Sequence, residues 1–421
     1  MKIVEIEVHQ IGLEYHDWLA YAMGHYYGPM QRTVYVAHTD NGLEGLGESG
    51  TPEPSEVVDR YVGTNPFDWI GDETSLGLGT AIYDLMGQAA GVPVHRLFGQ
   101  RYRAWVPVGS WTVSTHPDRM AEAVRRYAAQ GYTWLKYHLS PFENVFDQTR
   151  AMEAVAPAGF RVQYDFTMGG TTDPMPALLE RLADSPIAGC FEDPLPSRDI
   201  EGYRELRQRS RLPIVLHHAP LGAGFEVLMR IADAYILGHS RIGDAIRRAG
   251  LFAAGEIPFT LQNVGGTITR AMTTHMMAAF PSATFHFHSD TEIWRTDVTR
   301  EALEPVNGLL RVPDGPGLGV TLDRDALTRL SSLAVPPQPR WILRTRFASG
   351  AVMYNLTDPK DSLFMVRPDA RRLAPTSFEA SLSTEYWDDD GSAEYRAMLA
   401  RLEREGMVLE SPALDEGCAG G

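Results

Sequence analysis

The chain has 421 residues, of which 44% are hydrophobic, and this is enough for a large core and more than one domain. The formal net charge of −16 argues against a nucleic-acid-binding surface, because neutralising phosphates requires clustered Lys and Arg. The first ten residues alternate like a β-strand without the apolar run of a signal peptide, and no stretch is long enough to span a bilayer. With only two, distant cysteines, we expect a cytoplasmic protein without nucleic-acid or membrane partners.

Residues 1–104 are predicted to form an α+β domain. Alternating strands are expected at residues 2–10 and 32–38, and helical periodicity follows over residues 77–90. From about Val106 the pattern changes, since short β-rich runs alternate with amphipathic helical stretches. That alternation is typical of repeated βα units.

Polar residues end the predicted strands of this second region and recur every 21 to 27 residues. The predicted strand ends are His138, Asp165, Glu192, His218, His239, Asn263 and His288. With VPVGSW near Val106 as the first strand, residues 105–325 hold eight βα units, which favours a (β/α)₈, or TIM, barrel over an open sheet with a Gly-rich phosphate turn. Residues 326–421 are predicted to be a C-terminal extension that either returns to the N-terminal domain or forms a subunit contact.

The second predicted strand, TWLKYHL, contains one of only three lysines in the chain. Strand alternation points Lys136 and His138 to the same side, which is the barrel mouth if the assignment is right. A lysine desolvated beside another basic group is expected to have a pKa of about 7 to 8 and could act as a base near neutral pH. A solvated strand end is the alternative.

Acidic residues end the third and fourth predicted strands. Asp165 ends RVQYDF, and Glu192 lies in AGCFEDPLP, where alternation turns Asp193 away from Glu192. Carboxylates at the ends of adjacent barrel strands repel each other unless a cation lies between them. Asp165 and Glu192 therefore predict a divalent metal site, with a helix-capping turn as the alternative.

Together these residues resemble the enolase superfamily, in its mandelate racemase and muconate lactonizing branch. The resemblance rests on AIYDLMGQAAGVPVHRLFGQRYR, on Lys136 and His138, on Asp165 and Glu192, and on VPDGPGLGVTLD after the barrel. It implies a Mg²⁺ ion that holds a substrate carboxylate, a base that removes the α-proton, and a metal-stabilised enediolate. It also implies that residues 1–104 are a capping domain and that the protein is a homo-oligomer.

The chain departs from the family pattern at two places. Where the family has a third acidic metal ligand, this sequence has His218, so Mn²⁺, Fe²⁺ or Zn²⁺ becomes possible beside Mg²⁺. The family's Asp at the end of the sixth strand and His at the end of the seventh are absent, because these positions fall near Gly238 and Gln262. His239, beside Gly238, could still enter the site as a catalytic group. A missing dyad makes two-base racemisation less plausible than elimination.

Further candidates for acid catalysis and substrate binding lie at the eighth predicted barrel strand and in the N-terminal region. In HFHSDTEIW, Asp290 and Glu292 are candidates, with helix capping as the alternative. In AMGHYYGPM, His25 and Tyr26 are suited to a polyol or ring-bearing acid, unless the loop is purely structural.

The leading hypothesis is a metal-dependent lyase that removes the proton α to a carboxylate and eliminates water from an acid sugar or related hydroxy acid. Asp165, Glu192 and His218 would bind the metal, and Lys136 and His138 would transfer protons. A racemase, epimerase or cycloisomerase using the same enolate is the second hypothesis. A non-catalytic barrel that serves as a binding protein is the third.

Overall fold

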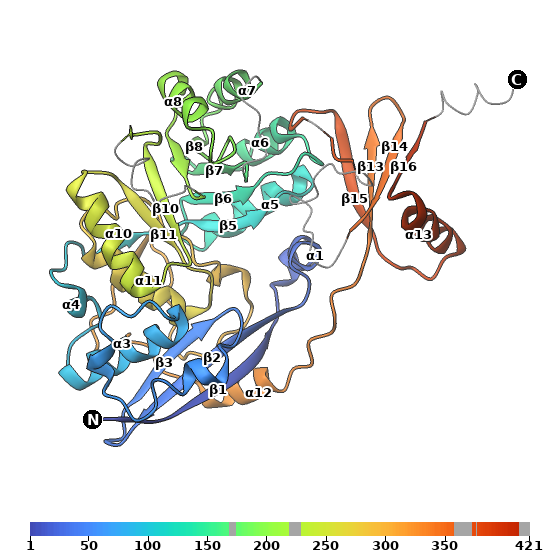
Figure 1. The fold of residues 1–421 in the computed structure, drawn as a ribbon. Helices are drawn as coiled ribbons and strands as arrows, with labels where there is room; N and C mark the ends of the chain where they lie inside the picture. The colour runs from blue at the N-terminus through green and yellow to red at the C-terminus, as the bar shows by residue number, and fades with distance from the viewer. Residues whose placement is uncertain (168–173, 219–228, 358–372, 376, 412–421) are drawn as a thin grey trace, which may run out of the picture.

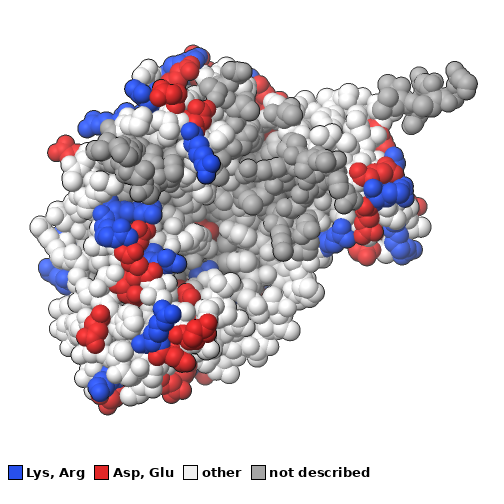
Figure 2. Space-filling model, in the orientation of Figure 1, with Lys and Arg blue, Asp and Glu red and all other residues white. Residues whose placement is uncertain are grey.

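The computed structural model describes residues 1–167, 174–218, 229–357, 373–375 and 377–411 (Figure 1). Among these residues, no helix is long and apolar enough to cross a membrane. On the face shown in Figure 2, the basic and acidic side chains that are described are interspersed. The face therefore carries charges of both signs on the barrel helices and on the C-terminal lobe alike.

A curled parallel sheet forms the centre of the molecule (Figure 1). Its strands follow chain order: β5 (Ser110–Val113), β6 (Trp134–His138), β7 (Arg161–Asp165), β8 (Ala188–Glu192), β9 (Ile214–Leu216), β10 (Ala234–Gly238) and β11 (Phe259–Gln262). These strands are largely buried on both faces, as expected where helices cover the outside and side chains fill the inside.

Residues 287 and 288 join the two edges of this sheet. Phe287 bridges Val108, just before β5, and His288 bridges Gln262 at the end of β11, both in parallel. Two isolated bridges thus take the place of the eighth strand of the expected barrel. The sheet is of the TIM-barrel type.

The expected first barrel strand needs a correction. VPVGSW is divided between two sheets: β4 (Trp105–Pro107) pairs antiparallel with β12 (Leu309–Arg311), whereas β5 begins the barrel. Gly109 lies at the division, and a Cβ there would lie 2.6 Å from a ring nitrogen of His288. The chain turns where only glycine leaves room for the histidines of the eighth position.

Amphipathic helices alternate with the strands. They are α5 (Pro117–Ala129), α6 (Val145–Glu153), α7 (Met175–Leu182), α8 (Ile200–Arg209), α10 (Ile242–Ala254) and α11 (Thr267–Ala279). In α5, for example, Pro117 occupies the first turn, where no amide donor is lost, and Met120, Val124 and Tyr127 are buried at helical spacing.

The N-terminal region contains an antiparallel sheet, β1 (Ile3–Leu13), β2 (Met30–Thr39) and β3 (Glu44–Ser49), and α1 (Asp17–Tyr26). Its other helices are α2 (Ser55–Val58), η1 (Pro66–Trp69), α3 (Leu76–Ala90) and α4 (His95–Phe98). Helix α3 packs on β3 so closely that a Cβ at Gly45 would lie 2.3 Å from the carbonyl oxygen of Ala81. Glycine therefore sets the distance between helix and sheet.

A buried carboxylate joins this region to the barrel. Glu48, on β3, accepts hydrogen bonds from the amides of Gly266 and Thr269 at the N-terminus of α11, and forms a 2.5 Å ion pair with Arg32. A carboxylate satisfies unpaired amides at a helix N-terminus and favours its dipole.

After η3 (Thr291–Ile293), the chain returns through α12 (Arg324–Ser331), which packs on β1, and then forms a separate lobe (Figure 1). This lobe has a four-stranded sheet in the order β15 (Leu382–Trp387), β13 (Ile342–Phe347), β14 (Val352–Leu356), β16 (Met407–Glu410), together with α13 (Ala393–Glu405). The C-terminal extension thus contacts the N-terminal region at two places, since α1 also touches β15.

Candidate active site

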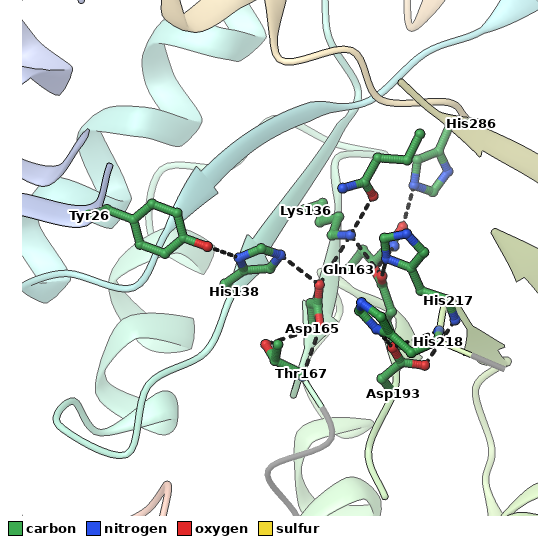
Figure 3. A network of polar contacts seen from close by, with 12 residues as sticks. Tyr26, Lys136, His138, Gln163, Asp165, Thr167, Asp193, His217, His218 and His286 are labelled. Carbon is green, nitrogen blue, oxygen red and sulfur yellow. Dashed lines mark hydrogen bonds and ion pairs between the residues drawn. The ribbon is translucent and has the colours of Figure 1, made fainter. Parts of the chain in front are cut away.

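Lys136 lies at the centre of a polar cluster inside the barrel (Figure 3). Its side chain has no exposed surface, and Nζ donates hydrogen bonds to Oε1 of Glu192 and to Oε1 of Gln262, each at 2.7 Å. Oδ2 of Asp165 lies 3.1 Å from the same nitrogen. Strands β6, β7, β8 and β11 thus direct one cation, two carboxylates and an amide to a single point.

The two carboxylates determine the charge of Lys136. Burial by itself would lower the pKa of the lysine, but the charges of Glu192 and Asp165 outweigh burial and raise the pKa above its ordinary value. This direction is opposite to that expected from the sequence, where the carboxylates were not known to surround Nζ. Lys136 is therefore held in its charged form by these two carboxylates.

His138 connects this cluster to α1. Its Nε2 lies 2.9 Å from Oδ2 of Asp165, and its Nδ1 lies 2.6 Å from the hydroxyl of Tyr26 (Figure 3). Trp111 also contacts the imidazole, edge to face at 5.2 Å. The expected partners Lys136 and His138 therefore meet at the same carboxylate oxygen.

Asp165 and Glu192 are both ionised in this arrangement. Burial would raise the pKa of Asp165, but Lys136 and His138 hold it well below its usual range. The pKa of Glu192 is also lowered, against burial and the charge of Asp165, by Lys136 and His217. Gln163 donates to Oε2 of Glu192 at 2.5 Å and so fixes that carboxylate.

The two histidines after β9 have different partners. Nδ1 of His217 lies 3.1 Å from Oε1 of Glu192, whereas Nδ1 of His218 lies 2.5 Å from Oδ2 of Asp193, and the His218 side chain is 44% exposed. Asp193 also accepts hydrogen bonds from both histidine amides. His217, not the expected His218, therefore has its ring beside the Asp165 and Glu192 pair.

Two groups of side chains could hold a divalent cation. In the first group, Oε1 of Glu192 lies 3.1 Å from Nδ1 of His217, and Nζ of Lys136 contacts both Oε1 of Glu192 and Oδ2 of Asp165, in the place where a cation would contact both carboxylates. Ligand atoms of Asp193, His217 and His218 also lie within 4.8 Å of one another. Among the described residues, only the second group brings three ligand atoms this close together, whereas the first group would need Lys136 to leave its place between the two carboxylates.

The eighth position adds buried polar groups that have no partner among the described residues. They are both ring nitrogens of His288 and Oδ1 of Asp290. Asp290 has φ of 57°, which is rare outside glycine, and burial, assisted by the charge of Glu292, raises its pKa to about 8. A protonated carboxyl held in a strained conformation is suited to proton donation.

No hydrogen bond or ion pair joins three other sequence candidates to the Lys136 cluster among the described residues. Glu292 accepts from the amide of Trp111 at 2.8 Å and pairs with buried Arg270 at 2.6 Å, an arrangement that favours a structural role. The ring of His25 stacks on Tyr386 and contacts Asp388 in the C-terminal lobe. His239 is exposed, with φ of 47°.

Sequence reasoning missed several residues of the cluster. Gln163 and Gln262 bind the carboxylate and the lysine from inside the barrel, and the ring of His286 lies 2.6 Å from Oε1 of Gln163. Strand alternation could have found Gln163, because it lies two residues before Asp165 and so shares its face. The choice of His217 depended on where β9 ends, which the sequence does not define.

Comparisons with known proteins agree with this geometry. Residues 119–326 match the family described as Enolase C-terminal domain-like. A cis-3-hydroxy-L-proline dehydratase from Roseibium aggregatum is 25% identical over 364 residues, which cover 78% of this chain and 98% of that protein. Muconate cycloisomerase 1-2 from Acinetobacter lwoffii is 27% identical over 265 residues, 60% of this chain and 68% of its own.

Solved structures show the same fold. An enolase from Thermobispora bispora, complexed with magnesium and formate, has a TM-score of 0.66 and 23% identity over 79% of this chain and 92% of that chain. An N-succinyl Arg/Lys racemase from Bacillus cereus has a TM-score of 0.66 and 19% identity over 79% of this chain and 99% of its own. The chain is therefore an enzyme that belongs to the enolase superfamily, in its mandelate racemase and muconate lactonizing branch.

Proposed function

We propose that this protein is a metal-dependent lyase that removes the proton α to a carboxylate and eliminates water from a hydroxy acid, with acid sugars as the leading substrate class. The observation that carries the proposal is the fully buried Lys136 between Asp165 and Glu192, with His138 on the same carboxylate oxygen. Several relatives are named as dehydratases of such acids, including a D-gluconate dehydratase from Thermoproteus tenax and a D-galactonate dehydratase from Xanthomonas oryzae.

Asp165, Glu192 and His217 would hold the metal ion, in place of the set with His218 that the sequence suggested. When bound, a divalent cation stabilises negative charge that develops on the substrate carboxylate. Mg²⁺ is the first candidate because enolases from Thermobispora bispora and Gibberella zeae were solved with magnesium. The imidazole leaves Mn²⁺, Fe²⁺ and Zn²⁺ as further candidates.

The chain's own groups would carry the protons. Once the carboxylates of Asp165 and Glu192 no longer neutralise Lys136, burial lowers its pKa, and neutral Nζ can take the α-proton. The electron pair left on the α-carbon forms the double bond to the β-carbon as the β-hydroxyl departs. Protonated Asp290 or His138 would give that hydroxyl the proton with which it leaves as water.

Lys136→Ala, with Lys2→Ala as a control for loss of one positive charge, tests the base. Because general base catalysis contributes about 10²- to 10⁴-fold, Lys136→Ala is expected to lose at least about 10²-fold in kcat on whichever hydroxy acid of a screened set the native enzyme dehydrates. Lys2 is exposed on the N-terminal sheet, so its variant should retain turnover. Unchanged turnover in Lys136→Ala would falsify the assignment.

A racemase, epimerase or cycloisomerase is the second candidate, since D-galactarolactone cycloisomerase from Agrobacterium fabrum is also a relative, 27% identical over 285 residues. Solvent deuterium that appears in recovered substrate without loss of water would favour it. Position 238 is a glycine and not an acidic residue, so a second base on the opposite face of the substrate is missing there. This favours elimination over racemisation by two bases.

The same proposal divides the chain into a capping domain (1–104), the barrel (105–325) and a C-terminal segment (326–421) that returns to the cap. The contacts of α12 with β1 and of β15 with α1 support this return. A cytoplasmic homo-oligomer acting on a small carboxylate stays our prediction. Sedimentation of the purified protein would test the oligomeric state.

A further inference from the structure

The C-terminal lobe and the barrel rim enclose a cavity outside the Lys136 cluster. Strand β15 is fixed to the rim by a hydrogen bond from Thr384 to the carbonyl of Phe142 and by contact between the rings of Tyr21 and Tyr386, 5.4 Å apart. The cavity between them has a volume of about 490 Å³, within the range of small-molecule sites. None of its lining residues belongs to the Lys136 cluster.

One side chain that lines this cavity is a buried carboxyl for which the described residues supply no hydrogen-bond donor. Glu143 is 4% exposed, and no donor of the described residues contacts its carboxyl group. Burial raises the pKa of Glu143 to about 8, and the nearby carboxylate of Asp147 adds to the effect. A buried acid without a donor is costly when ionised, so it favours a cationic ligand.

The cationic side chain on the cavity wall is already engaged. The guanidinium of Arg119 lies 4.1 Å from the centre of the Tyr21 ring, and Glu385 is paired with Arg344 at 2.7 Å. The charged or titratable side chains that line the cavity beside Glu143 are Tyr21, His116, Asp118, Arg119, Glu385 and Tyr386. Acidic groups outnumber the arginine, and two aromatic rings supply an apolar wall.

We propose that this cavity binds a small organic molecule with a primary ammonium group, whose N–H donors contact the Glu143 carboxylate while its carbon chain lies against Tyr21 and Tyr386. Charge-assisted hydrogen bonds to a desolvated carboxylate are the strongest contacts that the cavity offers. The aromatic rings add apolar contact for the carbon chain. The site is independent of the proposed lyase reaction, because the two sets of residues are separate.

Calorimetric titration with butylammonium at millimolar concentration tests the site, with 1-butanol and butyrate as neutral and anionic probes of the same length. We expect butylammonium alone to bind. Because Glu143 has to lose its proton, binding at pH 7 should release a proton to the buffer, and affinity should rise from pH 6 to pH 9. Equal binding of butylammonium and butanol, or no binding at all, overturns the proposal.

Glu143→Gln is expected to weaken butylammonium binding at least about tenfold, since a charge-assisted contact is lost. Glu122→Gln, on the outer face of α5, removes the same charge outside the cavity and should bind like the native protein. Thermal denaturation at pH 9 checks that Glu143→Gln is folded. Because the native carboxyl is ionised and buried at this pH, the Tm of the variant should be no lower than that of the native protein. Unaltered affinity in a folded Glu143→Gln variant contradicts the site.

Discussion

At the scale of single residues, the barrel interior contains polar groups of two kinds. Some satisfy one another, as Glu292 and Arg270 do, and these hold the structure. Others, such as Oδ1 of Asp290 and the ring nitrogens of His288, have no hydrogen-bond partner among the described residues. Unsatisfied buried groups also occur away from the barrel mouth, at Trp341 and Asn355 of the C-terminal lobe, so a role for Asp290 has to be tested by substitution.

Asp290→Asn is expected to change the pH profile of kcat. With a pKa of about 8, Asp290 is protonated at neutral pH and can donate a proton, so activity should fall as pH rises through about 8. Asparagine cannot donate in this way, and the variant should lose about 10²-fold in kcat together with that limb of the profile. A variant that keeps the limb would assign it to another group.

The same carboxyl predicts a trend in stability. The pKa of Asp290 is raised above its unfolded value of about 3.9, so the folded state binds the extra proton between about pH 4 and pH 8. Its contribution is complete below the unfolded pKa and is lost as pH rises through about 8. Thermal denaturation of Asp290→Asn should therefore show a weaker loss of Tm over this range than the native protein does.

Glu292→Ala is expected to destabilise the fold by about 3–5 kcal/mol, because Arg270 would remain buried and charged without its partner. The amide of Trp111 would lose its acceptor as well. Breaking the exposed pair of Glu122 and Arg126 by Glu122→Ala should cost about 0–1 kcal/mol. Denaturant titration compares the two, and equal costs would contradict the structural role of Glu292.

At the scale of elements, α1 is the link between the barrel and the C-terminal lobe. From one side of the helix, Tyr26 reaches Nδ1 of His138, and from another, His25 stacks on Tyr386 at 4.0 Å. His138 is positioned by the barrel, but Tyr26 depends on α1 for its place beside the imidazole. The extension therefore acts on the site indirectly, by fixing α1.

Tyr386→Ala is expected to loosen α1 without unfolding the barrel. Aromatic pairs contribute about 0.5–1.5 kcal/mol beyond area burial, so amide hydrogens of residues 17–26 should exchange about tenfold faster. Tyr354→Ala, on the β14 strand of the same sheet, packs towards α13 and serves as the control. Equal exchange in both variants would show that the lobe does not hold α1.

At the scale of the whole molecule, a divalent cation would join three barrel strands. It would bind β7 through Asp165, β8 through Glu192 and the end of β9 through His217, and so stabilise the folded state only. At a concentration about 100 times its Kd, the ion is expected to contribute about 2.7 kcal/mol. Chelation should lower Tm accordingly.

Variants of the two neighbouring histidines separate the possible ligand sets. His217→Ala should weaken Mn²⁺ or Mg²⁺ binding about tenfold or more, whereas His218→Ala should weaken it less, since that ring contacts Asp193. Asp165→Asn should abolish the rise in Tm that the ion produces. Elemental analysis and thermal scans measure both effects, and a larger loss in His218→Ala would restore the ligand set expected from the sequence.

The sequence by itself determined the parallel barrel, the order of the strand ends, and the face shared by Lys136 and His138. These follow from the periodicity of strands and helices, which depends only on residues that are close together in the sequence. It also identified Asp165 and Glu192, because each ends an apolar strand with a charge.

Only the tertiary structure showed the partners that set the charge of Lys136, the different contacts of His217 and His218, and the contacts of Glu292 and His25. Each depends on which distant side chain lies within about 3 Å: Glu192 beside Lys136, Asp193 beside His218, Arg270 beside Glu292. Periodicity predicts the face on which a residue lies but not its partner across the barrel. The ionisation of a buried group is set by that partner, because electrostatic interactions are strongest where water is excluded.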